Sequence, residues 1–425
     1  MSKISMIGAG SAVFARRLMT DVLSWPEFEA TEICLMDVNT ERLELIATLL
    51  RKMVAERKLG ARIEATTDRQ RALDGADYVI TTIAVGWNYE RERPEVAIPS
   101  RYGLQQSVAD TIGVGGIFRF LRTAPTMLDI CHDIERLCPT ALLLNYVNPM
   151  AMLCWAIGQA TRARTIGLCH SVQGTARQLA TYADVPFDEI SYWTAGINHQ
   201  AWYLTLRRGQ ENLYPRLRER SADPKILEQD RVRFEILRHF GYFVTESSRH
   251  MSEYVPYFRR TPELIEQFSP PPPQSTAARR EERFASIRRQ IDGAEPIDYN
   301  RTEEYCSYII HALETNRLFR FNANVPNHDL ISNLPRGCCV EVPCLADGSG
   351  IHPCHVGDLP AQLAAVNRTN VNVQELAVRA LLEADREAIY QAVQVDPLAS
   401  SVLSLAQMRQ MTDEVLKEHR EWVRF

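Results

Sequence analysis

The chain contains 425 residues, a length that exceeds one compact core and predicts two closely packed domains. Its hydrophobic fraction of 45% and charged fraction of 24% are typical of an ordinary soluble protein. The net charge of -5, with no basic cluster interleaved with aromatic residues, argues against a nucleic-acid-binding face.

Ten cysteines in a chain of this length do not indicate a disulfide framework. Together with an N-terminus that enters a strand at once, they predict a protein of the reducing cytoplasm. The one segment apolar enough to suggest a membrane helix, residues 141–160, contains Asn145, Asn148 and Pro149. We therefore interpret it as a buried strand, a turn and a helix, and we expect no contact with a membrane.

The N-terminal part of the chain alternates between apolar strands and helices. Residues 3–7 predict a strand, which a glycine-rich turn and a helix over about 15–24 follow. A second strand is predicted at 32–36 and a third, fully buried strand at 78–84. This alternation indicates an α/β fold with a doubly wound parallel sheet.

The turn after the first strand has the spacing of a dinucleotide-binding loop, G-x-G-x-x-V, in which Val13 replaces the third glycine. Gly8 permits the tight turn, Gly10 allows the backbone to approach a pyrophosphate, and the following helix N-terminus faces the phosphates. Asp37 ends the second strand and would accept hydrogen bonds from the adenosine ribose, which favours NAD over NADP. A helix-capping or turn aspartate is the alternative interpretation of Asp37.

Two later segments also predict close contacts. Between Asp110 and Arg119, three glycines within four positions predict a loop whose backbone approaches another group closely, although an ordinary surface loop is equally compatible. The segment 142–150 predicts a strand that feeds a helix, with Asn148 as its cap and Pro149 at its first position. Asn148 would also lie at the carboxyl end of a parallel strand, where such sheets bind ligands.

Cys169 and His199 each follow a short apolar run and are candidate ligands of one divalent metal ion. A structural zinc site needs four protein ligands, and no C-x-x-C pair lies near them in the sequence. Two protein ligands leave coordination positions open, as a catalytic metal that chelates its substrate requires. The alternative is a buried free cysteine and a histidine satisfied in the core.

The second half of the chain alternates less regularly, and we place the domain boundary after the strand near Ile166. Further along, His250 and Tyr254 are four residues apart and would share one face of a helix, although an aromatic stripe that buries the helix is as compatible. A polyproline break at 270–273 precedes a charged helix from about Ala277, which we interpret as a solvated surface face.

In this order, and over essentially the whole chain, these segments resemble glycoside hydrolase family 4 and, within it, the branch of NAD-dependent bacterial α-galactosidases. The residues that carry the resemblance are 8–11, 110–116, 145–152, 169–175, 196–199, 245–250 and 333–341. The resemblance implies a Rossmann-like doubly wound parallel sheet plus a larger α+β substrate domain, similar to the lactate and malate dehydrogenases. It also implies an NAD-binding domain at 1–166 and a substrate- and metal-binding domain at 167–425.

The resemblance implies a glycosidase that does not use two carboxylates. NAD+ would oxidise the C3 hydroxyl of the sugar, which acidifies the proton on C2, and a divalent metal, Mn2+ in most members, would chelate the C2 and C3 oxygens. A base would remove the C2 proton, and the glycosidic oxygen would leave by β-elimination. Water would then add to the unsaturated ketone and the bound NADH would return its hydride.

The resemblance also implies roles for single residues. Cys169 and His199 match the metal ligands, and Asn148 matches the residue that holds a sugar hydroxyl near the nicotinamide. Arg119 is a further candidate for substrate binding. The expected cofactor site comprises Gly8, Gly10, Ser11 and Asp37.

The acid and the base are less well determined by the resemblance. Tyr254 is the expected base, and His250 is the alternative, because the placement of this segment could differ by one helical turn. The phospho-α-glucosidase branch has an acidic Asp where this chain has His170. We therefore expect either His170 or Asp110 to protonate the leaving group.

Three alternatives remain compatible with the sequence. A 2-hydroxy-acid dehydrogenase would need no metal cysteine and would release NADH, whereas a dinucleotide-sensing protein would have lost catalysis. The same mechanism could act on α-glucosides or α-glucuronides, because the C4 hydroxyl is recognised by geometry that the sequence does not show. The relatives imply a homo-oligomer, either a dimer or a tetramer, that acts on a small sugar substrate.

Overall fold

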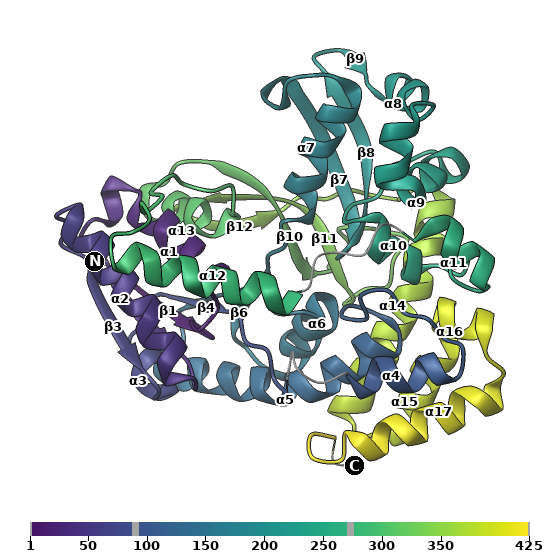
Figure 1. Ribbon diagram of the computed structural model, residues 1–425, viewed down its shortest axis with the longest axis horizontal. Helices are drawn as coiled ribbons and strands as arrows, with labels where there is room; N and C mark the ends of the chain where they lie inside the picture. The colour runs from purple at the N-terminus through teal and green to yellow at the C-terminus, as the bar shows by residue number, and fades with distance from the viewer. Residues whose placement is uncertain (1, 87–92, 270–275, 424–425) are drawn as a thin grey trace.

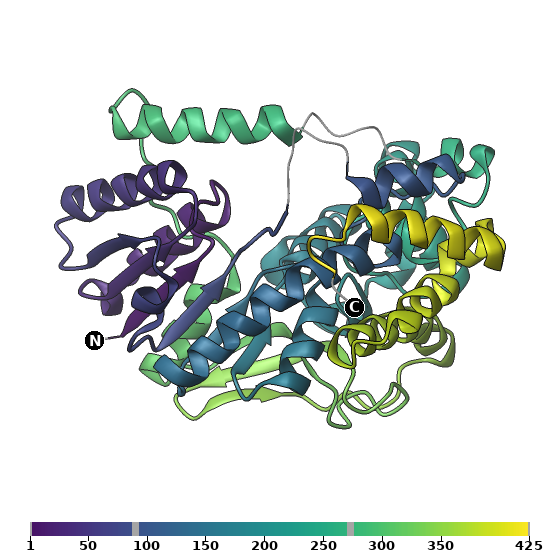
Figure 2. The same ribbon diagram turned by 90° about the horizontal axis from the view of Figure 1, so that it is seen from below.

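The computed structural model describes residues 2–86, 93–269 and 276–423 (Figures 1 and 2). The predicted polyproline break at 270–273 lies outside these residues. The strands of the described residues join into a single mixed sheet, whose first half is parallel and whose second half is antiparallel.

The parallel half of the sheet has the strand order β3-β2-β1-β4-β5-β6, which is the order of a dinucleotide-binding Rossmann fold. The predicted doubly wound parallel sheet is therefore confirmed. β4 and β5 are buried at every position, as expected for parallel strands covered on both faces. The strands are β1 (Lys3–Ile7), β2 (Glu32–Met36), β3 (Arg62–Thr66), β4 (Tyr78–Thr81), β5 (Leu142–Asn145) and β6 (Arg164–Gly167).

Helices connect these strands, and local capping marks where they begin. Asn39 accepts a hydrogen bond from the backbone N–H of Arg42 at 3.0 Å, so the chain leaves β2 and enters α2 within four residues. The helices of this half are α1 (Phe14–Leu23), α2 (Thr40–Glu56), α3 (Arg69–Leu73), α4 (Pro94–Arg101), α5 (Gly113–Leu137) and α6 (Met150–Ala160).

The second half of the chain extends the same sheet with β7 (Ile190–Ile197), β8 (Gln200–Arg208), β9 (Glu211–Asn212), β10 (Phe319–Pro326), β11 (Cys339–Asp347) and β12 (Gly350–Pro353). β10 joins the parallel half where Asn324 lies opposite Gly167 of β6. One continuous hydrophobic core spans both halves, and a smaller one lies between β8 and the helices beside it. Because the two predicted domains share a sheet, the boundary at residue 166 stays a prediction.

The helices of the second half surround this extension. Figure 1 shows α7 to α9 beside β7 and β8 at one end of the molecule, and α14 to α17 gathered at another. No helix in the described ranges is long and apolar enough to cross a membrane. These helices are α7 (Ser171–Ala183), α8 (Tyr214–Arg220), α9 (Pro224–Phe240), α10 (Ser248–Tyr254), α11 (Pro262–Phe268), α12 (Thr276–Ile291), α13 (Tyr305–Thr315), α14 (Ala361–Leu382), α15 (Arg386–Val395), α16 (Pro397–Val402) and α17 (Leu405–Glu418).

The glycine-rich segment after Asp110 is helical, so its prediction as a loop is wrong. Gly113 begins α5, and Gly115 and Gly116 lie in the first turn. A Cβ atom on Gly115 would lie 2.5 Å from the carbonyl oxygen of Ala109, and one on Gly116 would lie 2.5 Å from the carbonyl carbon of Thr111. These glycines therefore allow a helix to pack directly on the backbone of residues 109–111, which is the close approach that the sequence predicted.

The helix after β5 begins one residue later than predicted. Pro149 is the N-cap of α6 and the helix starts at Met150, so Asn148 does not cap it. The peptide bond between Asn148 and Pro149 is cis. Because Asn148 does not cap the helix, its side chain is available for contacts outside it, at the carboxyl end of a parallel strand.

Candidate active site

The glycine-rich turn and the acidic residue at the end of β2 are tied together. The backbone N–H of Gly10 donates to Asp37 Oδ2 at 2.8 Å, and that of Asn39 donates to Asp37 Oδ1 at 2.8 Å. Gly8 has a φ of +94°, and a Cβ atom there would lie 2.7 Å from the carbonyl carbon of Thr82. Glycine is therefore required at position 8, and Asp37 keeps lone pairs for a ligand outside the turn.

A cavity of about 670 Å³ opens beside this turn. Gly8, Gly10, Ser11 and Asp37, the four residues predicted to bind the cofactor, all line it. Three residues of α12, Arg280, Arg283 and Phe284, line it as well. The predicted solvated face is exposed at Arg279, Glu281, Glu282 and Arg283, but one side of α12 faces the dinucleotide cavity.

A second cavity of about 890 Å³ adjoins the first and shares part of its wall, including Ser11 and Arg283. The second cavity collects the remaining candidates except Tyr254; these are Asp110, Arg119, Asn148, Cys169, His170, His199 and His250, together with Glu246. Residues that follow β5 and β6, a residue of the turn between β7 and β8, and a residue of α10 thus meet in one space next to the dinucleotide cavity.

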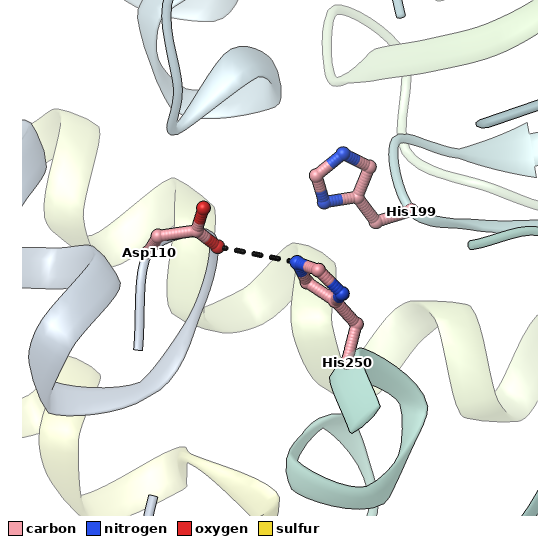
Figure 3. A group of neighbouring side chains, drawn as sticks. All are labelled: Asp110, His199 and His250. Atoms are coloured by element: carbon pink, nitrogen blue, oxygen red, sulfur yellow. Dashed lines mark ion pairs between the residues drawn. The ribbon is translucent and has the colours of Figure 1, made fainter. Parts of the chain in front are cut away.

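Three side chains in this cavity form a group of the kind that binds a metal ion. One ligand atom from each of Cys169, His199 and Glu246 lies within 4.8 Å of the others. Thiolate, imidazole and carboxylate donors together suit a divalent transition metal, and three protein ligands leave positions for substrate oxygens. Asp110, His199 and His250 form a second group within the same distance, and Figure 3 shows Asp110 and His250 side by side beneath His199.

The backbone of the metal group is held in an unusual conformation. His199 and Glu246 have φ values of 61° and 69°, in the left-handed region that side chains other than glycine rarely adopt. His199 Nε2 lies 3.7 Å from Glu246 Oε2. Two strained residues that face each other in a cavity indicate a function that requires this geometry.

Two hydroxyl groups hold the Nδ1 atom of the His199 imidazole. Its Nδ1 lies 2.9 Å from the hydroxyl of Thr111 and 3.3 Å from the hydroxyl of Tyr254. Nε2 is therefore the atom left to face Cys169 and Glu246. Hydrogen bonds to the second ring nitrogen are the usual way in which a protein fixes a histidine that binds a metal.

Comparison with known sequences identifies the family. Residues 3–185 match the sequence model of family 4 glycosyl hydrolases, and residues 194–399 match that of the family 4 glycosyl hydrolase C-terminal domain. The chain belongs to glycosyl hydrolase family 4. An α-galactosidase of Bacillus subtilis (strain 168) is 41% identical over 428 residues, which cover 100% of this chain and 99% of the relative. An α-galactosidase of Rhizobium meliloti (strain 1021) is 36% identical over 439 residues, which cover 99% and 89%.

Solved structures share the fold of this family 4 hydrolase. A 6-phospho-α-glucosidase from gut microorganisms, in complex with NAD and Mn2+, matches it with a TM-score of 0.83 at 20% identity over 99% of both chains. The malate dehydrogenase of Plasmodium falciparum matches with a TM-score of 0.52 at 12% identity, over 90% of this chain and 99% of that one. The predicted likeness to the dehydrogenase fold is confirmed.

Electrostatics in the family 4 site centre on His250, which lies between two carboxylates. Its Nδ1 is 3.1 Å from Glu246 Oε1, and its Nε2 is 3.7 Å from Asp110 Oδ1, the contact drawn in Figure 3. Burial disfavours the charged imidazole, but Glu246 and Asp110 outweigh that effect and raise the pKa of His250. Burial likewise opposes ionisation of Asp110, but His250 and Arg119, 3.4 Å away, lower its pKa.

Tyr254 lies behind the cavity wall of this family 4 hydrolase. Its side chain is 1% exposed, and burial, with Asp110 and Glu253 nearby, raises its pKa well above the usual value. Its ring centroid lies 6.1 Å from that of His250 on the same helix, α10. In this structure Tyr254 therefore contacts His199 and not the cavity.

Burial also raises the pKa of the Cys169 thiol, and Glu341 and Glu246 add to the effect. The unmetallated thiol is consequently neutral at pH 7. A coordinated divalent cation reverses this balance, because it deprotonates a bound thiol. Cys169 thus fits a metal site only as a thiolate that the cation itself stabilises.

Sequence reasoning missed three carboxylates of this site. Glu246 follows Thr245 within a segment that carried the resemblance, but only its φ of 69° turns it toward Cys169 and His199. Glu253 is buried on α10 and accepts hydrogen bonds from the backbone N–H groups of residues 107, 108 and 109 at 2.5, 3.0 and 2.9 Å. It therefore holds the segment that carries Asp110.

The third missed carboxylate is Glu341 of β11, which is completely buried opposite Gly196. Neither of its oxygens has a hydrogen-bond partner among the described residues. Burial raises its pKa to about 8, and His199 acts in the opposite direction. The sequence around Glu341 predicts a buried, apolar strand. It contains no local pattern that indicates a site residue.

Proposed function

We propose that this family 4 hydrolase cleaves α-galactosides, with NAD and a divalent metal ion, Mn2+, as cofactors. The proposed reaction comprises oxidation at C3, loss of the C2 proton, elimination of the aglycone, addition of water and reduction. The observation that carries the proposal is the shared wall between the two cavities. It lets a sugar held at the Cys169 group reach a dinucleotide held at the Gly8 turn.

The relatives support the choice of substrate and cofactors. The two full-length relatives at 41% and 36% identity are α-galactosidases, which supports an α-galactoside over an α-glucoside or α-glucuronide. A structural neighbour holds both NAD and Mn2+. When bound, NAD supplies a hydride acceptor and donor at the sugar C3, and the metal ion supplies polarisation of the C2 and C3 oxygens.

The residues of the chain fit these groups. Cys169, His199 and Glu246 would hold the metal ion, and their combined donor set leaves positions for two sugar hydroxyls. Asn148, at the carboxyl end of β5 and on the wall of the cavity, would hold a sugar hydroxyl. Gly8, Gly10, Ser11 and Asp37 would bind the dinucleotide. Arg119, on the wall of the second cavity, would anchor both Asp110 and the substrate.

We assign the proton transfers by position. His250 lines the cavity and Tyr254 does not, so we propose neutral His250 as the acceptor of the C2 proton and Tyr254 as a positioning residue for His199. A metal ion bound to Glu246 would offset the negative charge that raises the pKa of His250 and would so favour the neutral imidazole. Asp110 is held ionised by His250 and Arg119 and is a poor proton donor. We therefore propose His170, which begins α7 on the cavity wall, as the acid that protonates the leaving group.

Kinetics with a C2-deuterated substrate test the assignment of the base. The variant His250→Asn should lose exchange of the C2 proton with solvent, whereas Tyr254→Phe should retain exchange and bind the metal ion less tightly. The reverse pattern would make Tyr254 the base.

Hydrolysis of 4-nitrophenyl α-galactoside under reducing conditions tests the function as a whole. We expect activity only when NAD+ and Mn2+ are both present, and little turnover of the matched α-glucoside or α-glucuronide. Full activity without NAD+ would refute the mechanism. Turnover of only the glucoside or glucuronide would retain the mechanism and change the substrate, and net NADH formation with lactate or malate would indicate a dehydrogenase.

We also propose a cytoplasmic location and a homo-oligomer, either a dimer or a tetramer. None of the ten cysteines, all of which lie in described residues, is in a disulfide, which supports a reducing compartment. Light scattering of the purified protein would determine the number of subunits.

A further inference from the structure

Helix α12 belongs to the second half of the chain by sequence but lies against the first half. It follows α11 along the chain, yet it packs on α2 of the dinucleotide-binding half. Figures 1 and 2 both show it extended beside α2, and Figure 2 shows it apart from the other helices of the second half. The helix therefore crosses from one half of the molecule to cover the other.

Specific contacts fasten α12 in this place. Phe284 and Ile287 are buried, and the guanidinium of Arg42 on α2 lies over the Phe284 ring at 5.3 Å from its centroid. The ammonium group of Lys52 on α2 donates to the last carbonyls of α12, those of Gln290 and Ile291, at 3.0 and 2.7 Å. Lys52 thus places a positive charge at the negative end of the helix and caps it.

The fastened helix presents an apolar and a cationic group to the dinucleotide cavity. Phe284 lines the cavity, and so does Val38, which follows Asp37 and is 86% exposed. Val38 is thus an exposed apolar side chain next to the residue predicted to contact the ribose. A flat aromatic base could pack against it. Phe284 and Val38 therefore form two apolar walls near the adenosine end of the cavity.

Arg283 is a further residue of α12 on the wall of this cavity. It lines both the dinucleotide and the sugar cavity, as Ser11 and Val13 of the glycine-rich turn also do. Among the described residues it makes no ion pair or hydrogen bond. In dinucleotide-binding folds this turn faces the pyrophosphate, whose two phosphates suit a planar guanidinium.

We propose that α12 is a strap that completes the cofactor site, with Phe284 and Val38 enclosing the adenine ring and Arg283 binding the pyrophosphate. The proposal rests on the proposed use of NAD. Because the proposed reaction returns the hydride to the sugar, the dinucleotide does not need to leave between turnovers. A strap fastened at its C-terminal end by Lys52 then retains the cofactor and slows its release.

Binding to the full-length protein without sugar tests the strap directly. Calorimetry with ADP-ribose should show about tenfold or greater loss of affinity for Arg283→Ala, with adenosine binding unchanged. The variant Phe284→Leu should weaken both ligands. Arg289→Ala is the matched control, because Arg289 lies on the same helix, pairs with Glu282 and Glu295 at 2.8 and 3.1 Å, and does not line the dinucleotide cavity.

The rate of NAD+ release tests the contact of Lys52 with α12, because substitutions of Lys52 do not change a residue of the cavity wall. Lys52→Met should speed dissociation of NAD+ severalfold in stopped-flow fluorescence, and Lys52→Arg should restore the slow release. Lys417→Met on α17 should have no effect. Thermal unfolding without ligand identifies any variant that fails to fold. Unchanged affinity in Arg283→Ala would overturn the pyrophosphate contact, and unchanged release in Lys52→Met would overturn the fastening.

The outcomes separate the strap from the proposed function. If the parent protein binds NAD+ and both Arg283→Ala and Lys52→Met bind and release it as the parent does, the strap is overturned and the proposed function stands. If the parent protein fails to bind NAD+ under reducing conditions, the proposed function is overturned and the strap with it.

Discussion

At the scale of single residues, the site depends on side chains held in strained positions by neighbours. Glu246 has a left-handed backbone, and its carbonyl oxygen accepts a hydrogen bond from the buried Arg233. Arg233 is in turn paired with Asp230 inside the core. A buried ion pair thus stabilises the conformation that aims a carboxylate at Cys169.

Loss of a proposed metal ligand should weaken Mn2+ binding. We expect Cys169→Ser and Glu246→Gln each to lower the affinity by about tenfold or more, because each removes one negative donor from the cation. Electron paramagnetic resonance of free Mn2+ measures this without turnover. Cys354→Ser, a half-buried cysteine outside the cavity, is the matched control. Unchanged affinity in Glu246→Gln would restrict the protein ligands to Cys169 and His199.

At the scale of secondary-structure elements, α5 and α10 position the segment that carries Asp110 between them. Glycines at the start of α5 let it contact the backbone of residues 109–111. From the other side, Glu253 of α10 binds the backbone N–H groups of residues 107–109. Asp110 and Thr111 are consequently placed by two helices that hold their backbone directly.

A methyl group on α5 should displace this segment. Gly115→Ala places a Cβ atom 2.5 Å from the Ala109 carbonyl oxygen, and we expect a loss of about 1–3 kcal/mol in stability together with reduced activity. Gly174→Ala in α7 is the matched control, since no atom lies within 4 Å of the added carbon. The control should be neutral or up to about 1 kcal/mol more stable in thermal unfolding. Equal effects of the two substitutions would contradict the packing argument.

The cap of α16 should make stability depend on pH. Asp396 accepts a hydrogen bond from the Ala399 N–H at 2.8 Å, but its second oxygen is buried without a partner among the described residues. Burial raises its pKa to about 7, from 3.8. Between these values the folded protein binds a proton that the unfolded chain has lost, so stability decreases as pH rises and levels off above about pH 7.

Asp396→Asn removes this titration while it retains the cap. The free energy of unfolding of the parent should therefore fall relative to the variant between about pH 5 and pH 7, by at most about 1.4 kcal/mol per pH unit. Melting temperatures of both proteins across this range provide the measurement. Asp385→Asn, at the partly exposed cap of α15, should show no such difference. Parallel pH curves for parent and Asp396→Asn would contradict the prediction.

At the scale of the whole molecule, a buried polar network connects the C-terminal end with the first half. Arg122 of α5 lies 3.2 Å from Glu95 of α4 and 2.9 Å from His419, which follows α17. His419 Nε2 is also 3.3 Å from Glu95, and all three side chains are buried. The last helix is therefore anchored by charges as well as by apolar packing.

Removal of the central carboxylate should loosen this anchor. Glu95→Gln leaves Arg122 buried without its counter-charge, and we expect a loss of about 3–5 kcal/mol and a lower melting temperature. Glu414→Gln, which removes a partner of Arg101 at the surface, should change the melting temperature little. Similar effects of the two variants would show that the network does not stabilise the fold.

Much of the parallel half could be predicted because its signals are local. Runs of apolar residues produce buried strands, and the Gly8–Gly10 spacing and Asp37 lie within one β-α-β unit. Cys169 and His199 could be singled out for a similar reason, as reactive side chains at the ends of short apolar runs. The start of α5 could not be predicted, because glycine disfavours a helix locally, whereas close packing on residues 109–111 requires it.

The sequence by itself determined the family, the doubly wound parallel sheet, the dinucleotide turn and the pair Cys169 and His199. Only the tertiary structure decided that Glu246 joins that pair, that Tyr254 lies behind His199, and that α12 covers the dinucleotide cavity. The reason is physical, since these arrangements depend on side chains from segments far apart in the chain. Their distances follow from the packing of one shared sheet and its core, which no local pattern encodes.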